Sequence, residues 1–162
     1  MLVYWLGYCD GKYGATTVER VAVVGGSVSG YLKLGFICGF ADRGCTFRNC
    51  YVKDTIMNLN NAWDGSGGLW SDRSDGNAYA YYCYNSATYQ RTSSGTWYGK
   101  PICKDATSIT SCYYDTLKKP SYMPAQGGGI SNFGSMASLP SGFSSDTWQI
   151  VKGWPELKVF IK

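Results

Sequence analysis

A six-residue pattern of apolar and polar positions recurs four times along the chain. Its first, fourth and sixth positions are mostly apolar, while its second, third and fifth positions are mostly polar or tyrosine. The fourth positions follow one another at steps of 29, 33 and 29 residues (21 to 50, 50 to 83, 83 to 112). A near-constant step of this size is typical of stacked supersecondary units, because one unit alone cannot bury its apolar face. The four copies are Val18–Val23, Phe47–Val52, Ala80–Asn85 and Ile109–Tyr114.

The spacing inside each copy predicts a strand with a bend. A straight strand alternates with period 2, whereas the apolar residues here are spaced three and then two apart, so the chain should turn at the third position. Asn49 and Ser111 suit such a corner, because short polar side chains satisfy local backbone groups. A glycine-led apolar strand precedes each copy and a weaker strand, such as Ile56-Met57, follows it. Glycine-rich clusters are predicted turns. These clusters lie at 25–27, 64–68 and 93–95.

Short strands separated by turn residues, without a helical period, predict an all-β protein. Stacking of the repeats predicts a parallel β-helix, or β-solenoid, of about four coils over residues 1–115. The repeat stops after Tyr114, and we expect residues 116–162 to form an irregular C-terminal cap with a short helical turn near 132–138. Such a cap would cover the open sheet edge that a solenoid leaves at its end.

The chain has seven cysteines, and Cys50, Cys83 and Cys112 share the fourth position of the pattern. Equivalent residues of a parallel ladder lie about 4.8 Å apart, but their Cβ vectors run parallel, which disfavours disulfides between them. Because free cysteine behaves as a small apolar residue, we expect a buried column of thiols. The odd number leaves at least one cysteine unpaired or paired between chains. A zinc site is disfavoured, since the chain has no His and no Cys-x-x-Cys pair.

Composition narrows the range of partners. Charged residues make up 16% of the chain, against a usual value of roughly 25%, and the formal charge of +4 is scattered rather than gathered in a basic stripe. We therefore expect no nucleic-acid partner. No apolar run is long enough to span a membrane, so no membrane insertion is expected. The first residues lack the basic and apolar regions of a signal peptide, and we expect the chain to open inside a repeat, with any export signal upstream.

Two segments resemble a known family. Gly35–Gly39, followed by Gly44–Val52, resembles the GLUG motif of bacterial surface proteins. The C-terminal part resembles the way these arrays close, and the resemblance covers about residues 6–160. It implies a parallel β-helix on an exported protein, often an adhesin, located at the cell surface or outside the cell. The C-terminal match consists of Ser111–Asp115, Met136, Trp148 and Gly153–Leu157.

The fifth position of the pattern should point outward, because it lies between two inward residues. It holds tyrosine in three of the four copies, so the tyrosines should stack in a row on the outer surface. An exposed aromatic row can stack on the apolar faces of sugars and mark an interaction site. The alternative is that the row only stabilises the sheet through packing between neighbours. The candidate ligand-binding residues are Tyr51, Tyr84, Tyr113, Tyr81, Trp70 and Trp97.

The sequence does not support catalysis. The usual general base is missing because the chain has no His, and no aspartates occupy the same position of adjacent repeats. The glycine runs lack phosphate-binding and dinucleotide-binding motifs, so no catalytic residue and no cofactor are expected. Segments 60–66 and 72–77 are rich in oxygen ligands that calcium would accept, but their spacing matches no EF-hand, and turn formation explains them. No metal is expected.

Three hypotheses for the function remain open. The first is a non-catalytic module of a bacterial or phage-associated surface protein that binds a glycan or a cell surface through an aromatic face. The second is a structural fibre or filament subunit that self-associates end to end through the solenoid edges. The third is a polysaccharide-active enzyme on the same fold, which would need a cleft with paired carboxylates.

Overall fold

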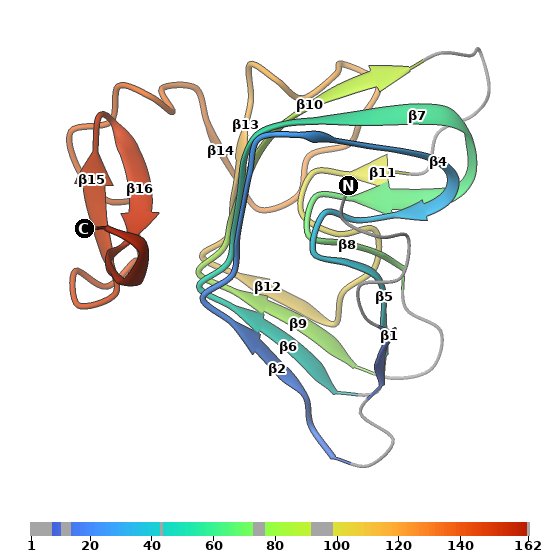
Figure 1. Ribbon diagram of the computed structural model, residues 1–162, viewed down its shortest axis with the longest axis horizontal. Coiled ribbons are helices and arrows are strands. Elements are labelled where there is room, and N and C mark those ends of the chain that lie inside the picture. Colours follow the sequence, from blue (N-terminus) through green and yellow to red (C-terminus); the bar gives the residue numbers. More distant parts are fainter. Residues whose placement is uncertain (1–7, 11–13, 43, 73–76, 92–98, 162) are drawn as a thin grey trace.

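The computed structural model describes residues 8–10, 14–42, 44–72, 77–91 and 99–161. Its regular elements are strands, together with the short 3-10 helix η2 (Lys158–Phe160), so the prediction of an all-β protein is confirmed. The strands form separate sheets, three of them with parallel pairing (Figure 1). No helix in these ranges is both long and apolar enough to cross a membrane.

Successive repeats contribute neighbouring strands to each parallel sheet. A three-stranded sheet has the order β1-β5-β8, and a four-stranded sheet has the order β12-β9-β6-β2. The seven-stranded sheet has β11-β7-β10-β13-β14 as its path, with β3 and β4 also paired to β7. The strands of the three-stranded sheet are β1 (Tyr8–Asp10), β5 (Cys38–Asp42) and β8 (Trp70–Asp72). Those of the four-stranded sheet are β2 (Thr17–Glu19), β6 (Cys45–Arg48), β9 (Ala78–Tyr81) and β12 (Ser108–Thr110). Those of the seven-stranded sheet are β3 (Ala22–Val24), β4 (Ser27–Leu34), β7 (Tyr51–Gly67), β10 (Tyr84–Arg91), β11 (Gly99–Lys100), β13 (Tyr113–Asp115) and β14 (Gly128–Ile130).

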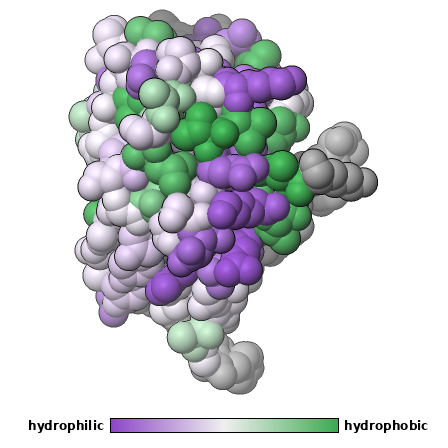
Figure 2. All heavy atoms as spheres, turned by 90° about the vertical axis from the view of Figure 1, so that its left-hand side faces the viewer, coloured by the Kyte–Doolittle hydropathy of each residue, from purple (hydrophilic) through white to green (hydrophobic). Residues whose placement is uncertain are grey.

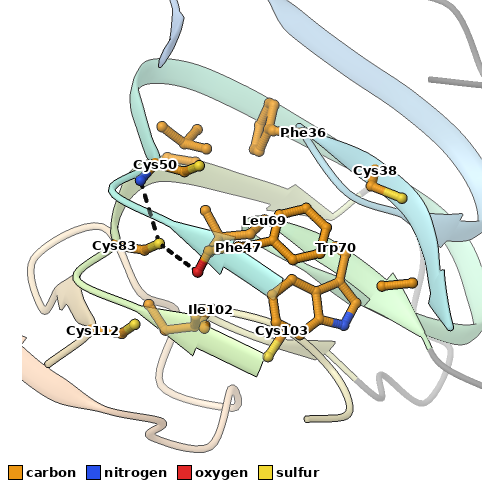
Figure 3. Packing of buried hydrophobic residues seen from close by; sticks show 14 of the residues in the cluster. Phe36, Cys38, Phe47, Cys50, Leu69, Trp70, Cys83, Ile102, Cys103 and Cys112 are labelled. Atoms are coloured by element: carbon orange, nitrogen blue, oxygen red, sulfur yellow. Dashed lines mark hydrogen bonds between the residues drawn. The ribbon is translucent and has the colours of Figure 1, made fainter. Parts of the chain in front are cut away.

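The register between strands follows the repeat read from the sequence. Tyr51 pairs with Ala22 on one side and Tyr84 on the other, and Tyr84 pairs in turn with Tyr113. The residue before each tyrosine accepts a backbone hydrogen bond from the next strand, so the fourth positions lie in one column. Figure 3 shows Cys50, Cys83 and Cys112 one above another in this column. The stacking of equivalent positions is confirmed.

The predicted bend at the third position is also confirmed. All four third-position residues have left-handed backbone, with φ of 56° at Arg20, 52° at Asn49, 56° at Tyr82 and 48° at Ser111. Residues other than glycine adopt this region at a cost, and Asn does so most readily. The corner turns the chain from the four-stranded sheet into the seven-stranded sheet, as Figure 1 shows at the point where these two sheets meet.

The main core lies between the sheets and contains the cysteine column. Cys50, Cys83 and Cys112 are buried free thiols, as expected, and the backbone N–H of Cys50 donates to Cys83 Sγ at 3.4 Å. Burial raises the pKa of Cys83, so its thiol remains neutral. Phe47 stacks on Trp70 with ring centroids 4.5 Å apart (Figure 3). Cys45 differs from these residues, because it is disulfide-bonded.

Two local expectations are wrong. Residues 64–67 were expected in a turn but belong to β7, which curves without interruption (Figure 1). Glycine is needed at position 67 because another part of the backbone approaches it closely: a Cβ on Gly67 would lie 2.0 Å from the Trp70 carbonyl oxygen. Residues 132–138 form no helix and hold a hydrogen-bonded turn, in which the Ser135 N–H donates to the Asn132 carbonyl at 3.0 Å. The turn expected at 93–95 lies outside the described residues.

The C-terminal segment has two parts, and only the first lies at the sheet edge. Parallel pairing continues beyond residue 115, since β14 pairs with β13. Gln126 Oε1 accepts hydrogen bonds from the backbone N–H groups of Ile102 and Cys103 at 3.2 and 2.8 Å, and Met123 is buried in the main core. The second part carries the antiparallel hairpin of β15 (Trp148–Val151) and β16 (Trp154–Leu157). This hairpin packs against the outer face of the seven-stranded sheet and not at the sheet edge (Figure 1).

Candidate binding face

The predicted row of tyrosines exists, but it is not exposed. Tyr51 and Tyr84 stack with ring centroids 5.0 Å apart and planes within 11°, as the outward fifth position requires. Their exposed fractions are 2% and 0%, and Tyr113 is half-buried. The expectation that this row forms an outer binding surface is therefore wrong for Tyr51 and Tyr84.

The hairpin side of the molecule covers the row with aromatic side chains. The Trp148 ring centroid lies 5.9 Å from that of Tyr51 and 6.0 Å from that of Tyr84, and Phe133 stacks on Tyr84 at 5.0 Å. These residues belong to a second buried cluster that excludes water from the tyrosines. Figure 2 looks at this side and shows a surface of intermixed apolar and hydrophilic side chains. The fifth-position tyrosines thus contribute to internal packing.

Polar contacts at the rim of this cluster fix the hairpin to the sheet. The Tyr51 hydroxyl donates to Glu156, and Lys53 Nζ lies 2.6 Å from Glu156 Oε1. The indole N–H of Trp148 donates to Asn49 Oδ1 at 3.0 Å, where both side chains are buried. Burial, and then the adjacent Glu156 carboxylate, raise the pKa of Tyr51 above its usual range. The tyrosine therefore stays a neutral hydrogen-bond donor.

The two further candidates that the structure describes, Trp70 and Tyr81, lie in different sheets. Trp70 is fully buried in the main core, where its indole N–H donates to the Asp105 carbonyl at 3.0 Å, so its expected exposure is also wrong. Trp97 lies outside the described residues. Tyr81 is half-buried on β9, in the four-stranded sheet.

The outer side of the four-stranded sheet carries a second pair of tyrosines. Ala78 and Ala80 of β9 are fully buried, so Tyr79 and Tyr81 point to the opposite side of the sheet. The two rings have centroids 6.2 Å apart and planes within 12°. Their hydroxyl groups make no hydrogen bond to the part of the chain that the structure describes. Two similarly oriented aromatic rings with unused polar groups are therefore open to a ligand.

The register shows what borders the two rings. Tyr81 lies between Arg48 of β6 and Thr110 of β12, and Tyr79 lies between Thr46 and Ser108. The guanidinium carbon of Arg48 is 5.5 Å from the Tyr81 ring centroid. On the β12 side the register neighbours Ser108 and Thr110 are short, so β12 places no large side chain beside either ring. We call this surface the tyrosine face. It consists of Thr46, Arg48, Tyr79, Tyr81, Ser108 and Thr110.

Sequence reasoning identified Tyr81 but missed Tyr79 and Arg48. The available signal was the alternation of Ala78-Tyr79-Ala80-Tyr81, whose period of 2 places both tyrosines on one side of a strand. Because the repeat pattern begins at Ala80, Tyr79 fell outside it. The packing of Arg48 against Tyr81 depends on the register between β6 and β9, which the repeat alignment already contained.

The structure describes only a small part of the oxygen-rich segments 60–66 and 72–77. In the described ranges, no group of three or more His, Cys, Asp or Glu side chains is arranged to hold a metal ion. The side chains of residues 60–65 and 72 and all of residues 73–76 lie outside the described part.

Comparison with known proteins identifies no relative, since no family model, curated protein or solved structure matches the chain.

Proposed function

We propose that this chain is a non-catalytic β-solenoid module of an exported bacterial or phage-associated surface protein, and that it binds a glycan through the tyrosine face. The observation that carries the proposal is the pair formed by Tyr79 and Tyr81, whose half-buried rings lie 6.2 Å apart with planes within 12°. Aromatic rings fixed on a sheet offer an apolar contact surface with a polar hydroxyl at its edge. This combination suits a sugar, which also has apolar faces and polar edges.

The solenoid part of the proposal interprets the three parallel sheets as faces of one β-helix. Its support is that the second repeat contributes β5, β6 and β7 in order, and the third contributes β8, β9 and β10, one strand to each sheet. The left-handed corners recur at the same position in every repeat. The resemblance to GLUG repeats points to the same architecture.

The proposed location outside the cell has support from cysteine chemistry. Cys45 is disulfide-bonded, and disulfides persist in oxidising environments such as the cell exterior. The buried thiols of Cys50, Cys83 and Cys112 are compatible with this location, because their burial protects them from exchange and oxidation.

The test compares the wild-type chain with Tyr79→Thr/Tyr81→Thr on a glycan array, followed by calorimetry with the best glycan. Threonine is chosen because it favours strands and already occupies the neighbouring positions Thr46 and Thr110. Tyr122→Ala is the matched control, since Tyr122 is 46% exposed and also has an arginine over its ring, at 5.6 Å. Far-UV circular dichroism and thermal melting check that each variant folds.

We expect the double variant to lose about tenfold or more in affinity, equivalent to about 1.4 kcal/mol, while Tyr122→Ala binds as the wild type does. The proposal fails if no glycan binds the wild-type chain, or if the folded double variant binds equally well. Release of reducing sugar from a bound polysaccharide would show instead that the chain is an enzyme.

The fibre hypothesis is a second candidate, because both terminal strands of the four-stranded sheet, β2 and β12, pair on one side only within the described residues. Within the described residues, β2, β3 and β4 each pair on one side, which leaves a sheet edge available for pairing. At the opposite end, β14 covers β13 and Gln126 accepts hydrogen bonds from the backbone of residues 102 and 103, while in the described part of the chain β12 pairs only with β9. Light scattering that showed concentration-dependent polymers would favour a fibre subunit over the binding module.

A further inference from the structure

The tyrosine face carries one cation whose charge has no partner in the described structure. Arg48 is exposed, and its guanidinium group contacts the Tyr81 ring at 5.5 Å. The guanidinium group makes no hydrogen bond or ion pair with any described residue. An arginine normally offers five N–H donors, so most of its binding capacity is unused.

The nearby carboxylate does not neutralise Arg48. Glu19 is the register neighbour of Arg48 on β2, but its Oε1 atom lies 3.8 Å from Arg20 Nε and accepts a hydrogen bond from Asn49 Nδ2 at 3.3 Å. The charges of Glu19 and Arg20 therefore cancel, and Arg48 leaves one positive charge in excess at this end of the four-stranded sheet. β9 and β12 contribute no charged side chain to this surface.

We propose that the glycan bound at the tyrosine face is acidic, and that Arg48 binds its carboxylate or sulfate group. This inference rests on the proposed function. The planar guanidinium group matches the two oxygens of such an anion and forms paired hydrogen bonds with them. Contact with the Tyr81 ring limits the positions of the guanidinium group, so the anion would lie beside a sugar unit stacked on that ring. Tyr79 would contact the next unit along β9.

The experiment uses calorimetry on the full chain with four polymers. Polygalacturonate carries carboxylates, and its fully methyl-esterified form has the same backbone without charge. Dextran sulfate and neutral dextran form the corresponding pair for sulfate. The variants are Arg48→Gln, which removes the charge, and Arg48→Lys, which keeps the charge but loses the planar pair of donors. Arg91→Gln is the matched control, because Arg91 lies over the Tyr122 ring at 5.6 Å and is also exposed.

We expect wild-type binding to an acidic polymer to exceed binding to its neutral form about tenfold, and to weaken with added salt. Arg48→Gln should abolish this preference, Arg48→Lys should retain part of it, and Arg91→Gln should leave it unchanged. A preference for polygalacturonate identifies a carboxylate ligand, and a preference for dextran sulfate alone identifies a sulfate ligand.

Two results would overturn the inference. Equal wild-type affinity for charged and neutral forms, with binding still lost in Tyr79→Thr/Tyr81→Thr, would leave the glycan function standing and remove the acidic specificity. An unchanged preference in Arg48→Gln would assign the anion to another residue. Absence of binding to these polymers and to the whole glycan array would instead refute the proposed function itself.

Discussion

Asn49 combines a strained corner with a buried hydrogen bond, and replacing it with alanine should be costly for two separate reasons. Its φ is 52°, and its Oδ1 atom accepts the hydrogen bond from the indole N–H of Trp148, which is fully buried. Asn49→Ala leaves that N–H without an acceptor, which costs about 1–3 kcal/mol. Alanine also tolerates left-handed backbone less well than asparagine, by about 1 kcal/mol. We expect a total loss of about 2–4 kcal/mol, a large part of the about 5–15 kcal/mol that stabilises a typical domain.

A double-mutant cycle with Trp148→Phe separates the two costs. Phenylalanine keeps an aromatic ring in the second buried cluster but has no N–H to satisfy, so Asn49→Ala should cost only about 1–2 kcal/mol in that background, from the backbone and from the loss of the 3.3 Å hydrogen bond to Glu19. Asn49→Gly should show the reverse, because glycine relieves the backbone cost and still removes the acceptor. Urea unfolding followed by far-UV circular dichroism gives each free energy, and an unchanged slope would show that the unfolding transition is comparable among variants.

Arg20→Ala is the matched control for the corner. Arg20 occupies the same repeat position with φ of 56°, but its side chain is exposed and only pairs with Glu19. A surface pair of this kind contributes little, so we expect a change within about 0.5 kcal/mol. If Asn49→Ala costs the same in the wild-type background as in the Trp148→Phe background, the hydrogen bond contributes no net stability and the explanation is refuted.

Two further predictions concern the tyrosines and the glycines. Burial raises the pKa of Tyr51, Tyr84 and Tyr89, so the unfolded chain loses these protons at a lower pH than the folded chain does. The free energy of unfolding should therefore be highest below about pH 10 and fall above it by up to about 1.4 kcal/mol per pH unit for each tyrosine. Urea unfolding across alkaline pH measures this, and a flat profile would contradict it. Gly67→Ala should prevent folding or cost more than about 3 kcal/mol, because its Cβ would lie 2.0 Å from the Trp70 carbonyl oxygen and 2.6 Å from Cys103 Cα. The control Gly25→Ala, at a site with open space but φ of 73°, should cost only about 1–2 kcal/mol. Equal melting temperatures for the two variants would refute the close approach at Gly67.

The repeat could be predicted from the sequence because stacking imposes the same environment on equivalent positions. Cys50, Cys83 and Cys112 share a column in which each residue has similar neighbours above and below, so a small apolar side chain recurs. The bend followed from the change in apolar spacing, and Asn49 and Ser111 are common corner residues. These features depend only on local geometry and on the repeat length, both of which can be read along the chain.

The location of the C-terminal hairpin could not be predicted in the same way. Tyrosine suits either an exposed row or a buried one, because its ring is apolar and its hydroxyl polar. Whether Tyr51 and Tyr84 are covered depends on Trp148, which comes 97 residues after Tyr51 and 64 residues after Tyr84 in the chain. Trp148 and Leu157 clearly required an apolar partner, but the sequence offered two, the sheet edge and the tyrosine row. Gln126 and Met123 occupy the edge, which leaves the row for the hairpin.

The two sets of tyrosines therefore have different roles that follow from the same corner. Asn49 ends the segment that carries Arg48, and its side chain is held by the buried indole of Trp148 from the hairpin. The hairpin covers Tyr51 and Tyr84 on one side of this corner, while Arg48 and Tyr81 remain accessible on the other. Asn49 directly follows Arg48, and its left-handed backbone sets the direction of the chain at the end of β6. The hydrogen bond to Trp148 therefore restrains the residue next to Arg48. Packing of the C-terminal hairpin thus supports the geometry of the tyrosine face without taking part in it.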